Sequence, residues 1–224
     1  MPTMRSLLDG TIPASIGAGT LSPHFNYLVS ADAGCDGGGL GWTKGNDAVQ
    51  SVSLVNPFSF GPFGDGWPYN GQGAANVSMT ADFKSLGSDH DGAKAQVQII
   101  STFFAKCGCC GGCHPGGDAH AEVQWLSDLV LPGRADEQWR ITVTIDQRVT
   151  GDALGQGMPV PPCTISIENQ VYPVNPGSTI DLISGVYSMV FQSSKAGLSN
   201  RDRGNTDEAH ATLTQTLKIE AKKV

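Results

Sequence analysis

Four of the six cysteines in this sequence stand close together in a glycine-rich run, and a histidine follows them directly. The run, KCGCCGGCHPGGDAHA, spans residues 106–121. Its candidate ligands are Cys107, Cys109, Cys110, Cys113 and His114. Zinc prefers thiolate and imidazole ligands and usually takes four of them, at about 2.0 to 2.3 Å. Because glycine lets the backbone turn back tightly between ligands, the run predicts a structural zinc site.

The spacing of the cysteines leaves two other interpretations open. Cys110 and Cys113 have the two-residue separation typical of zinc knuckles, whereas Cys107 and Cys109 stand closer than usual. Six cysteines could instead form up to three disulfides in an oxidising compartment, or the thiols could remain reduced. In the disulfide alternative, Cys35 and Cys163 are the natural partners of two loop thiols. Sequence alone does not decide among these three states.

Acidic and imidazole side chains also alternate with apolar ones where the chain leaves the cysteine run. Asp118, His120 and Glu122 are two residues apart, so on a strand they would share one face. Such a row could ligate a divalent cation or transfer protons, although it more often forms the solvated face of a strand. We therefore regard His120, together with His114, as a secondary zinc ligand.

A second segment with binding chemistry is the aromatic run PFSFGPFGDGWPYNG at residues 57–71. Its glycines and prolines favour an irregular loop. Phe63, Trp67 and Tyr69 would suit a sugar-stacking platform or a protein interface, where Trp and Tyr often dominate binding. The alternative is a loop whose rings are buried over one end of the core.

The elements that must position these residues are β-strands. Clean alternation of apolar and polar residues predicts strands at 48–55, 77–84, 95–104, 121–131, 139–149 and 211–219, with shorter ones at 163–168, 178–183 and 186–192. Turn signals separate them, and there is no long amphipathic helix. Eight to ten short strands indicate an all-β protein, an antiparallel β-sandwich with a jelly-roll-like topology.

We further expect two specific strand pairings. The strands at 95–104 and 121–131 flank the cysteine run, so they are expected to form a hairpin with the cysteine loop, residues 106–120, at its tip. The last strand, 211–219, is expected to pair with 186–192. The strand at 48–55 is expected to stop at Asn56-Pro57.

The domain organisation follows from the same patterns. Residues 1–47 have little periodicity and predict an irregular N-terminal arm with one short strand at 21–31. Residues 48–224 are long enough for a single β-sandwich domain that contains the cysteine loop.

Charge excludes some partners. The net charge of -7 and the isoelectric point near 5.0 disfavour nucleic acid, whose affinity depends on Lys and Arg displacing counterions. We expect neither a secretory signal nor a transmembrane helix, because the N-terminal residues lack a continuous apolar core and no apolar run is long enough to span a membrane. We therefore expect cytoplasmic synthesis or an assembled particle, with a processed secreted form as the alternative, and in a reducing compartment zinc is favoured over disulfides.

Three classes of function fit these observations. The first is a non-enzymatic structural or interaction protein that assembles with itself or with protein partners. The second is a ligand-binding module that uses the aromatic segment on carbohydrate or on a membrane target, as a toxin would. The third is a metal-dependent or redox enzyme centred on the cysteines and histidines. The third ranks last because no G-x-S-x-G, H-E-x-x-H, P-loop or dinucleotide motif is present.

Overall fold

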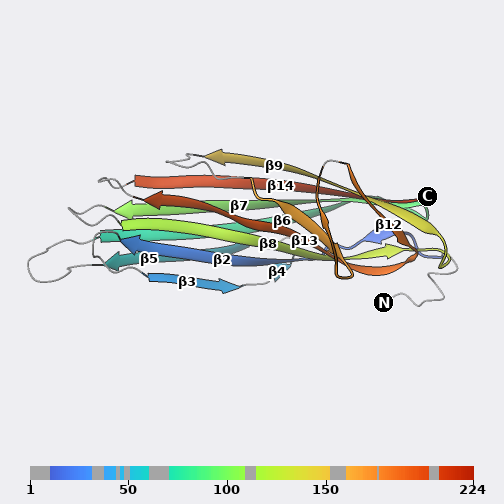
Figure 1. The fold of residues 1–224 in the computed structure, drawn as a ribbon, viewed down its shortest axis with the longest axis horizontal. Coiled ribbons are helices and arrows are strands. Elements are labelled where there is room, and N and C mark those ends of the chain that lie inside the picture. Colours follow the sequence, from blue (N-terminus) through green and yellow to red (C-terminus); the bar gives the residue numbers. More distant parts are fainter. Residues whose placement is uncertain are drawn as a thin grey trace, which may run out of the picture.

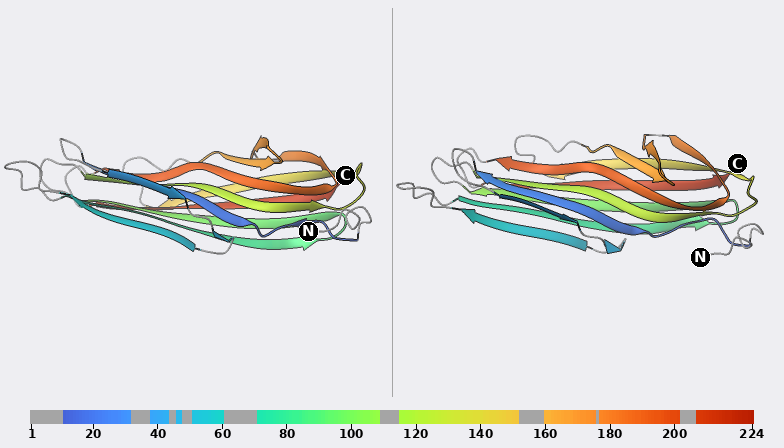
Figure 2. Two further views of the ribbon diagram at one scale, coloured as in Figure 1. Left: turned by 90° about the horizontal axis from the view of Figure 1, so that it is seen from below. Right: turned by 60° about the horizontal axis from the view of Figure 1, so that its bottom comes forward.

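The computed structural model describes residues 11–31, 38–43, 46–47, 51–60, 71–108, 115–151, 160–175, 177–201 and 207–224. In this part of the chain fourteen β-strands form two antiparallel sheets, without a helix (Figure 1). Two further views show the sheets stacked as layers whose strands follow the long axis of the molecule (Figure 2). The predicted all-β antiparallel sandwich is confirmed, and its jelly-roll-like topology stays a prediction.

We name the first layer sheet A. Its strands are β1 (Ser15–Ile16), β2 (Thr20–Ala31), β3 (Gly38–Thr43), β4 (Asn46–Asp47), β8 (Pro115–Leu131), β10 (Cys163–Ile167), β11 (Gln170–Pro173) and β13 (Gly185–Arg201). The order across the sheet is β11-β10-β13-β8-β2-β3, with β1 beside β8 and β4 beside β2.

The second layer is sheet B. Its strands are β5 (Ser51–Phe60), β6 (Gly71–Ser88), β7 (Gly92–Gly108), β9 (Gln138–Gly151), β12 (Ser178–Ile183) and β14 (Asp207–Lys223). They are ordered β12-β9-β14-β7-β6-β5. The chain changes sheets repeatedly after β7, because β8, β10, β11 and β13 lie in sheet A whereas β9, β12 and β14 lie in sheet B.

The strands are more numerous and longer than the sequence predicted. Strands β7, β8, β13 and β14 have 17 residues each and β6 has 18. At about 3.3 Å per residue, such a strand is roughly 55 Å long. Clean alternation marks only the middle of each strand. Pairing with neighbouring strands continues each strand into its glycine-rich ends. For example, Gly73 of β6 lies opposite Cys107 of β7.

The expected N-terminal arm also contains regular structure. The predicted strand at 21–31 is confirmed as β2, which pairs with β8 from Thr20 opposite Leu126 to Ala31 opposite Pro115. The described residues within 1–47 include strands β1 to β4 of sheet A, and the division into an N-terminal arm and one domain stays a prediction. Three of the six residues of β3 are glycine, a residue that is depleted in strands, so its sequence gave only a weak strand signal.

The predicted break at Asn56-Pro57 is wrong. Strand β5 continues through it to Phe60, and Pro57 lies opposite Ala74 of β6. Because β5 is the outermost strand of sheet B, a residue without an N–H is tolerated there.

Both predicted pairings between neighbouring strands are wrong. Strand β7 pairs with β6 and β14 in sheet B, whereas β8 pairs with β13 and β2 in sheet A, so the cysteine loop is not a hairpin tip. Strand β14 likewise pairs with β7 and β9, not with β13. Alternation along a strand shows which residues share a face, but it carries no information about the partner strand.

The core lies between the two sheets and follows the alternation predicted for single strands. In β9, Trp139, Ile141 and Val143 are buried and Arg140 is exposed. The largest fully buried side chains are Trp125, Trp139, Phe103, Phe191, Leu21, Met79, Ile99, Leu129, Leu131, Ile141 and Ile165. Two contacts position the Trp125 side chain. Its Nε1 donates a hydrogen bond to the Ala18 carbonyl at 3.0 Å, and its ring stacks on the Phe83 ring with 6.2 Å between the ring centroids.

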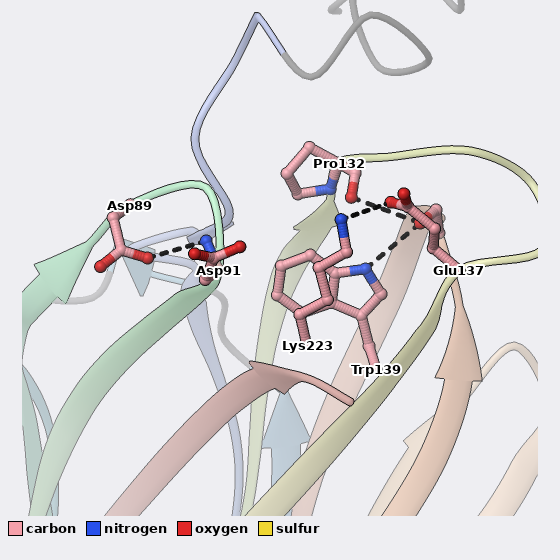
Figure 3. A network of polar contacts seen from close by, with 7 residues as sticks. Asp89, Asp91, Pro132, Glu137, Trp139 and Lys223 are labelled. Atoms are coloured by element: carbon pink, nitrogen blue, oxygen red, sulfur yellow. Dashed lines mark hydrogen bonds and ion pairs between the residues drawn. The ribbon is translucent and has the colours of Figure 1, made fainter.

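Polar contacts join several elements at one end of the sandwich, which we call the proximal end (Figure 3). Trp139 Nε1 donates to Ser184 Oγ at 3.2 Å, and Ser184 Oγ donates to the Pro132 carbonyl at 3.3 Å. Lys223 Nζ lies 2.6 Å from the Glu137 carboxylate. These contacts tie the turn between β8 and β9 to the start of β13 and to the C-terminal strand.

The Glu137 contact makes stability depend on pH. The hydrogen bond from Lys223 lowers the pKa of the Glu137 carboxyl below its ordinary value of 4.5. A carboxyl whose pKa is lower in the folded than in the unfolded state stabilises the fold at pH values above its unfolded-state pKa. That contribution is lost as the pH falls through the folded-state pKa. Wild type should therefore be more stable than Glu137→Gln at neutral pH, and the difference should vanish well below pH 4.5. Urea unfolding of both proteins across this range measures it, and a difference independent of pH would contradict the assignment.

Candidate functional site

Eight strand ends gather at the end of the sandwich opposite the proximal end (Figure 1). They are Ala31 of β2, Gly38 of β3, Phe60 of β5, Gly71 of β6, Gly108 of β7, Pro115 of β8, Arg201 of β13 and Asp207 of β14. The pairing register brings them level: in sheet B, for example, Gln72 lies opposite Gly108 and Cys107 opposite Asp207. We call this the distal end.

Most of the predicted site residues belong to segments that these strand ends flank. Outside the described residues lie Cys35, Phe63, Trp67, Tyr69, Cys109, Cys110, Cys113 and His114. Phe60 and Gly71, which flank the aromatic segment, form a cross-strand pair at the distal end. Gly108 and Pro115, which flank three of the clustered cysteines, belong to different sheets. The chain between them therefore joins the end of sheet B to the end of sheet A.

Two predicted ligands lie within described strands. Cys107 is the penultimate residue of β7, opposite Gly73 and Asp207. His120 is in the first part of β8, opposite Asn26 and Gly197. Asp118 and Glu122 are on the same strand, so the predicted row of alternating polar residues does lie on one strand.

The sixth cysteine, Cys163, is part of a buried polar cluster between the sheets. In sheet A it lies opposite Ser193, and in sheet B Gln147 lies opposite Gln215. Gln215 Nε2 donates to Ser193 Oγ at 3.0 Å and to Cys163 Sγ at 3.5 Å, while Gln147 Nε2 is 3.4 Å from the same sulfur. We call these four residues the Cys163 cluster, and it connects two strands of each sheet.

The Cys163 cluster does not have the chemistry of a nucleophilic site. Burial raises the pKa of the Cys163 thiol, and the hydrogen bonds from Ser193, Gln147 and Gln215 oppose this less strongly. A reactive cysteine needs a neighbour that favours the thiolate, whereas the neighbours here are neutral amides and a hydroxyl. Cys163 is a buried free thiol, so the disulfide alternative is wrong in pairing it with a loop cysteine.

Two polar atoms in this part of the core lack a hydrogen-bond partner. They are Gln215 Oε1 and Ser101 Oγ, and both residues are only 1% exposed. Leaving such an atom unpaired costs about 1 to 3 kcal/mol. Sequence reasoning missed this cluster, although a signal was available, because Gln215 occupies an inward position in the alternation of Leu213, Leu217 and Ile219.

Where side chains are described, no group of three or more His, Cys, Asp or Glu residues could hold a metal ion. No helix in the described part of the chain is long and apolar enough to cross a membrane. Comparison with protein-family models, curated proteins and solved structures found no match.

The cluster yields a prediction about stability. Gln215→Met removes the unpaired Oε1, and Ser193 Oγ keeps its bond to the Ser194 carbonyl. We expect the free energy of unfolding to rise by about 1 kcal/mol, because an unpaired acceptor leaves the core. Leu217→Met, a swap of similar volume two residues along β14, is the control and should cost less than about 1.5 kcal/mol. Urea unfolding measures both, and destabilisation by Gln215→Met would refute the account of the cluster.

A second prediction concerns the reactivity of Cys163. Its raised pKa and its 7% exposure keep the thiolate scarce and shielded. In the folded protein, alkylation by iodoacetamide should be at least about tenfold slower at Cys163 than in the urea-unfolded chain. Peptide mapping by mass spectrometry gives the rate at this residue. Equal rates in the two states would mean that the thiol is not buried in solution.

Proposed function

We propose that this protein is a non-enzymatic structural or interaction module, an elongated β-sandwich that carries its binding chemistry at the distal end. One observation supports this most strongly: the connection holding three clustered cysteines begins in sheet B and ends in sheet A. A cross-link in such a connection shortens the chain that joins the two sheets, and so limits how far their distal ends can separate. In a hairpin tip it would restrain only one turn.

The cross-link that fits best is a structural zinc ion. Cys107, Cys109, Cys110 and Cys113 supply four thiolates, with His114 and His120 as alternative ligands. Four protein ligands fill a tetrahedral shell, which makes a zinc site structural, whereas a catalytic zinc keeps one position open. Metal binding of this kind contributes directly to folding free energy.

The proposal predicts a paired loss of zinc and stability. Cys110→Ser and Cys113→Ser should each reduce bound zinc and lower Tm by about 5 °C or more, because a weaker site contributes less to folding. Cys163→Ser is the matched control, since its sulfur contacts Gln147 and Gln215 within the core. Zinc content by elemental mass spectrometry and thermal unfolding are the readouts.

The control makes the outcomes distinct. Cys163→Ser should keep its zinc, whatever its effect on Tm. Unchanged zinc in both loop variants would remove Cys110 and Cys113 from the site. Equal loss of zinc in all three variants would show that general destabilisation, and not loss of a ligand, releases the metal.

A second candidate function is ligand binding through the aromatic segment. It is supported by the cross-strand pair of Phe60 and Gly71, which anchors that segment at the distal end. Phe63, Trp67 and Tyr69 would then bind carbohydrate, a protein surface or a membrane target. Loss of glycan or liposome binding in Trp67→Ala, with zinc content preserved, would support this role, and unchanged binding would exclude Trp67 from it.

A further inference from the structure

Among the described residues, strand β9 has an unpaired outer edge over its distal half, which we call the open edge. On one side β9 pairs with β14 as far as Gly151, opposite Ala211. On the other side β12 pairs with β9 only up to Val143, opposite Ser178. From Thr144 to Gly151 no described residue pairs with this outer side. Figure 1 shows the arrow of β9 along the border of the sheet, beyond the short β12.

The register identifies the backbone groups that point outward from this edge. The Glu137 carbonyl accepts from Ser184 N on the β12 side, and the Gln138 carbonyl accepts from Val224 N on the other side. Direction alternates along a strand, and the pairing of β9 with β14 has no register shift. Ile145, Gln147 and Val149 therefore present their N–H and C=O groups to the open edge.

Three of the devices that protect a sheet edge are missing from residues 144–151 of β9. Proteins blunt exposed edges with proline, bulges or inward-pointing charges. The opposite edge strand of sheet B, β5, contains Pro57. Strand β9 has no proline, its register is unbroken, and its inward residues Ile145 and Val149 are apolar and pack against the core. The open edge is therefore suited to pairing with another strand.

The charges on this stretch are complementary to a reversed copy of themselves. Asp146 and Arg148 are exposed on the outer face, and their neighbours on β14 are the neutral Thr216 and Thr214. Neither charge forms an ion pair among the described residues. Asp146 and Arg148 lie on either side of Gln147. If a second copy of the strand ran antiparallel and were centred on the same residue, each charge would therefore lie opposite a charge of the other sign.

We propose that the β9 edge pairs with the same edge of a second copy of this chain, antiparallel and centred on Gln147. In this register Asp146 faces Arg148 of the partner subunit, and Ile145 faces Val149 of the partner subunit. Asp146 and Arg148 fall at non-hydrogen-bonded positions, where opposite side chains come closest. The inference rests on the proposed interaction function and deepens it by naming one partner.

The geometry of such a dimer is closed. A twofold axis uses the same edge on both copies, so pairing ends at two chains. Ile145, Gln147 and Val149 would form about six inter-subunit backbone hydrogen bonds, two for each hydrogen-bonded pair. The two six-stranded B sheets would become one continuous sheet.

Charge reversal tests the register directly. Asp146→Arg sets arginine against Arg148 of the partner subunit, and Arg148→Asp sets aspartate against Asp146 of the partner subunit. By sedimentation velocity, each single variant should raise the dimer dissociation constant at least about tenfold, since like charges across an interface cost several kcal/mol. The double reversal should restore it. An equimolar mixture of the two single variants should form heterodimers, because that mixture pairs opposite charges.

The control and the contrary results are equally specific. Lys218→Glu reverses an exposed charge on the same outer face but on β14, one strand inside the edge, and should leave the dimer intact. A wild-type monomer, or single reversals that leave the dimer unchanged, would overturn the inference. Zinc measured on the same samples separates the two proposals, since a monomer that keeps its zinc would leave the proposed function standing.

Discussion

The rest of this structure depends on register between strands that are buried on one face only. Leu213, Leu217 and Ile219 face the core from β14, whereas Lys218 between them is exposed. A slip of one residue would exchange the two faces and bury the polar one, so burial of one face excludes such slips in the long strands. Because register is fixed along 17 residues, the strand ends are level, and this brings distant segments of the chain to the same end.

Because the chain passes repeatedly from one sheet to the other, connections at both ends of the sandwich join the two sheets. At the proximal end the crossings are secured by side chains in the described structure, with Trp139 bound to Ser184 and Lys223 to Glu137. At the distal end we propose that the cysteine segment has the equivalent role. Between the two ends, the Cys163 cluster introduces polar contacts where an apolar core would be more stable.

Sequence reasoning succeeded where the information is local and failed where it is not. The faces of β9 followed from alternation, since Ile141 and Val143 are buried and Ile145 is half-buried against the core, as the pattern predicted. The partner of β7 did not follow, because pairing depends on contacts between residues far apart in sequence. The cysteine segment itself was evident from composition. That its flanking strands belong to different sheets was not, and neither was the burial of Cys163 beside Gln215.

We propose that the cysteine segment binds a metal ion in the connection between the two sheets. The most direct measurement is a native mass spectrum of the wild-type protein, followed by denaturation without reductant and alkylation. We expect extra mass equal to one zinc ion per chain, which disappears on denaturation, with all six thiols then alkylated. A native mass equal to that of the bare chain would contradict the claim. If the native protein carries no metal and some thiols resist alkylation, the cross-link consists of disulfides. If it carries no metal and all six thiols are alkylated, the distal end has no cross-link.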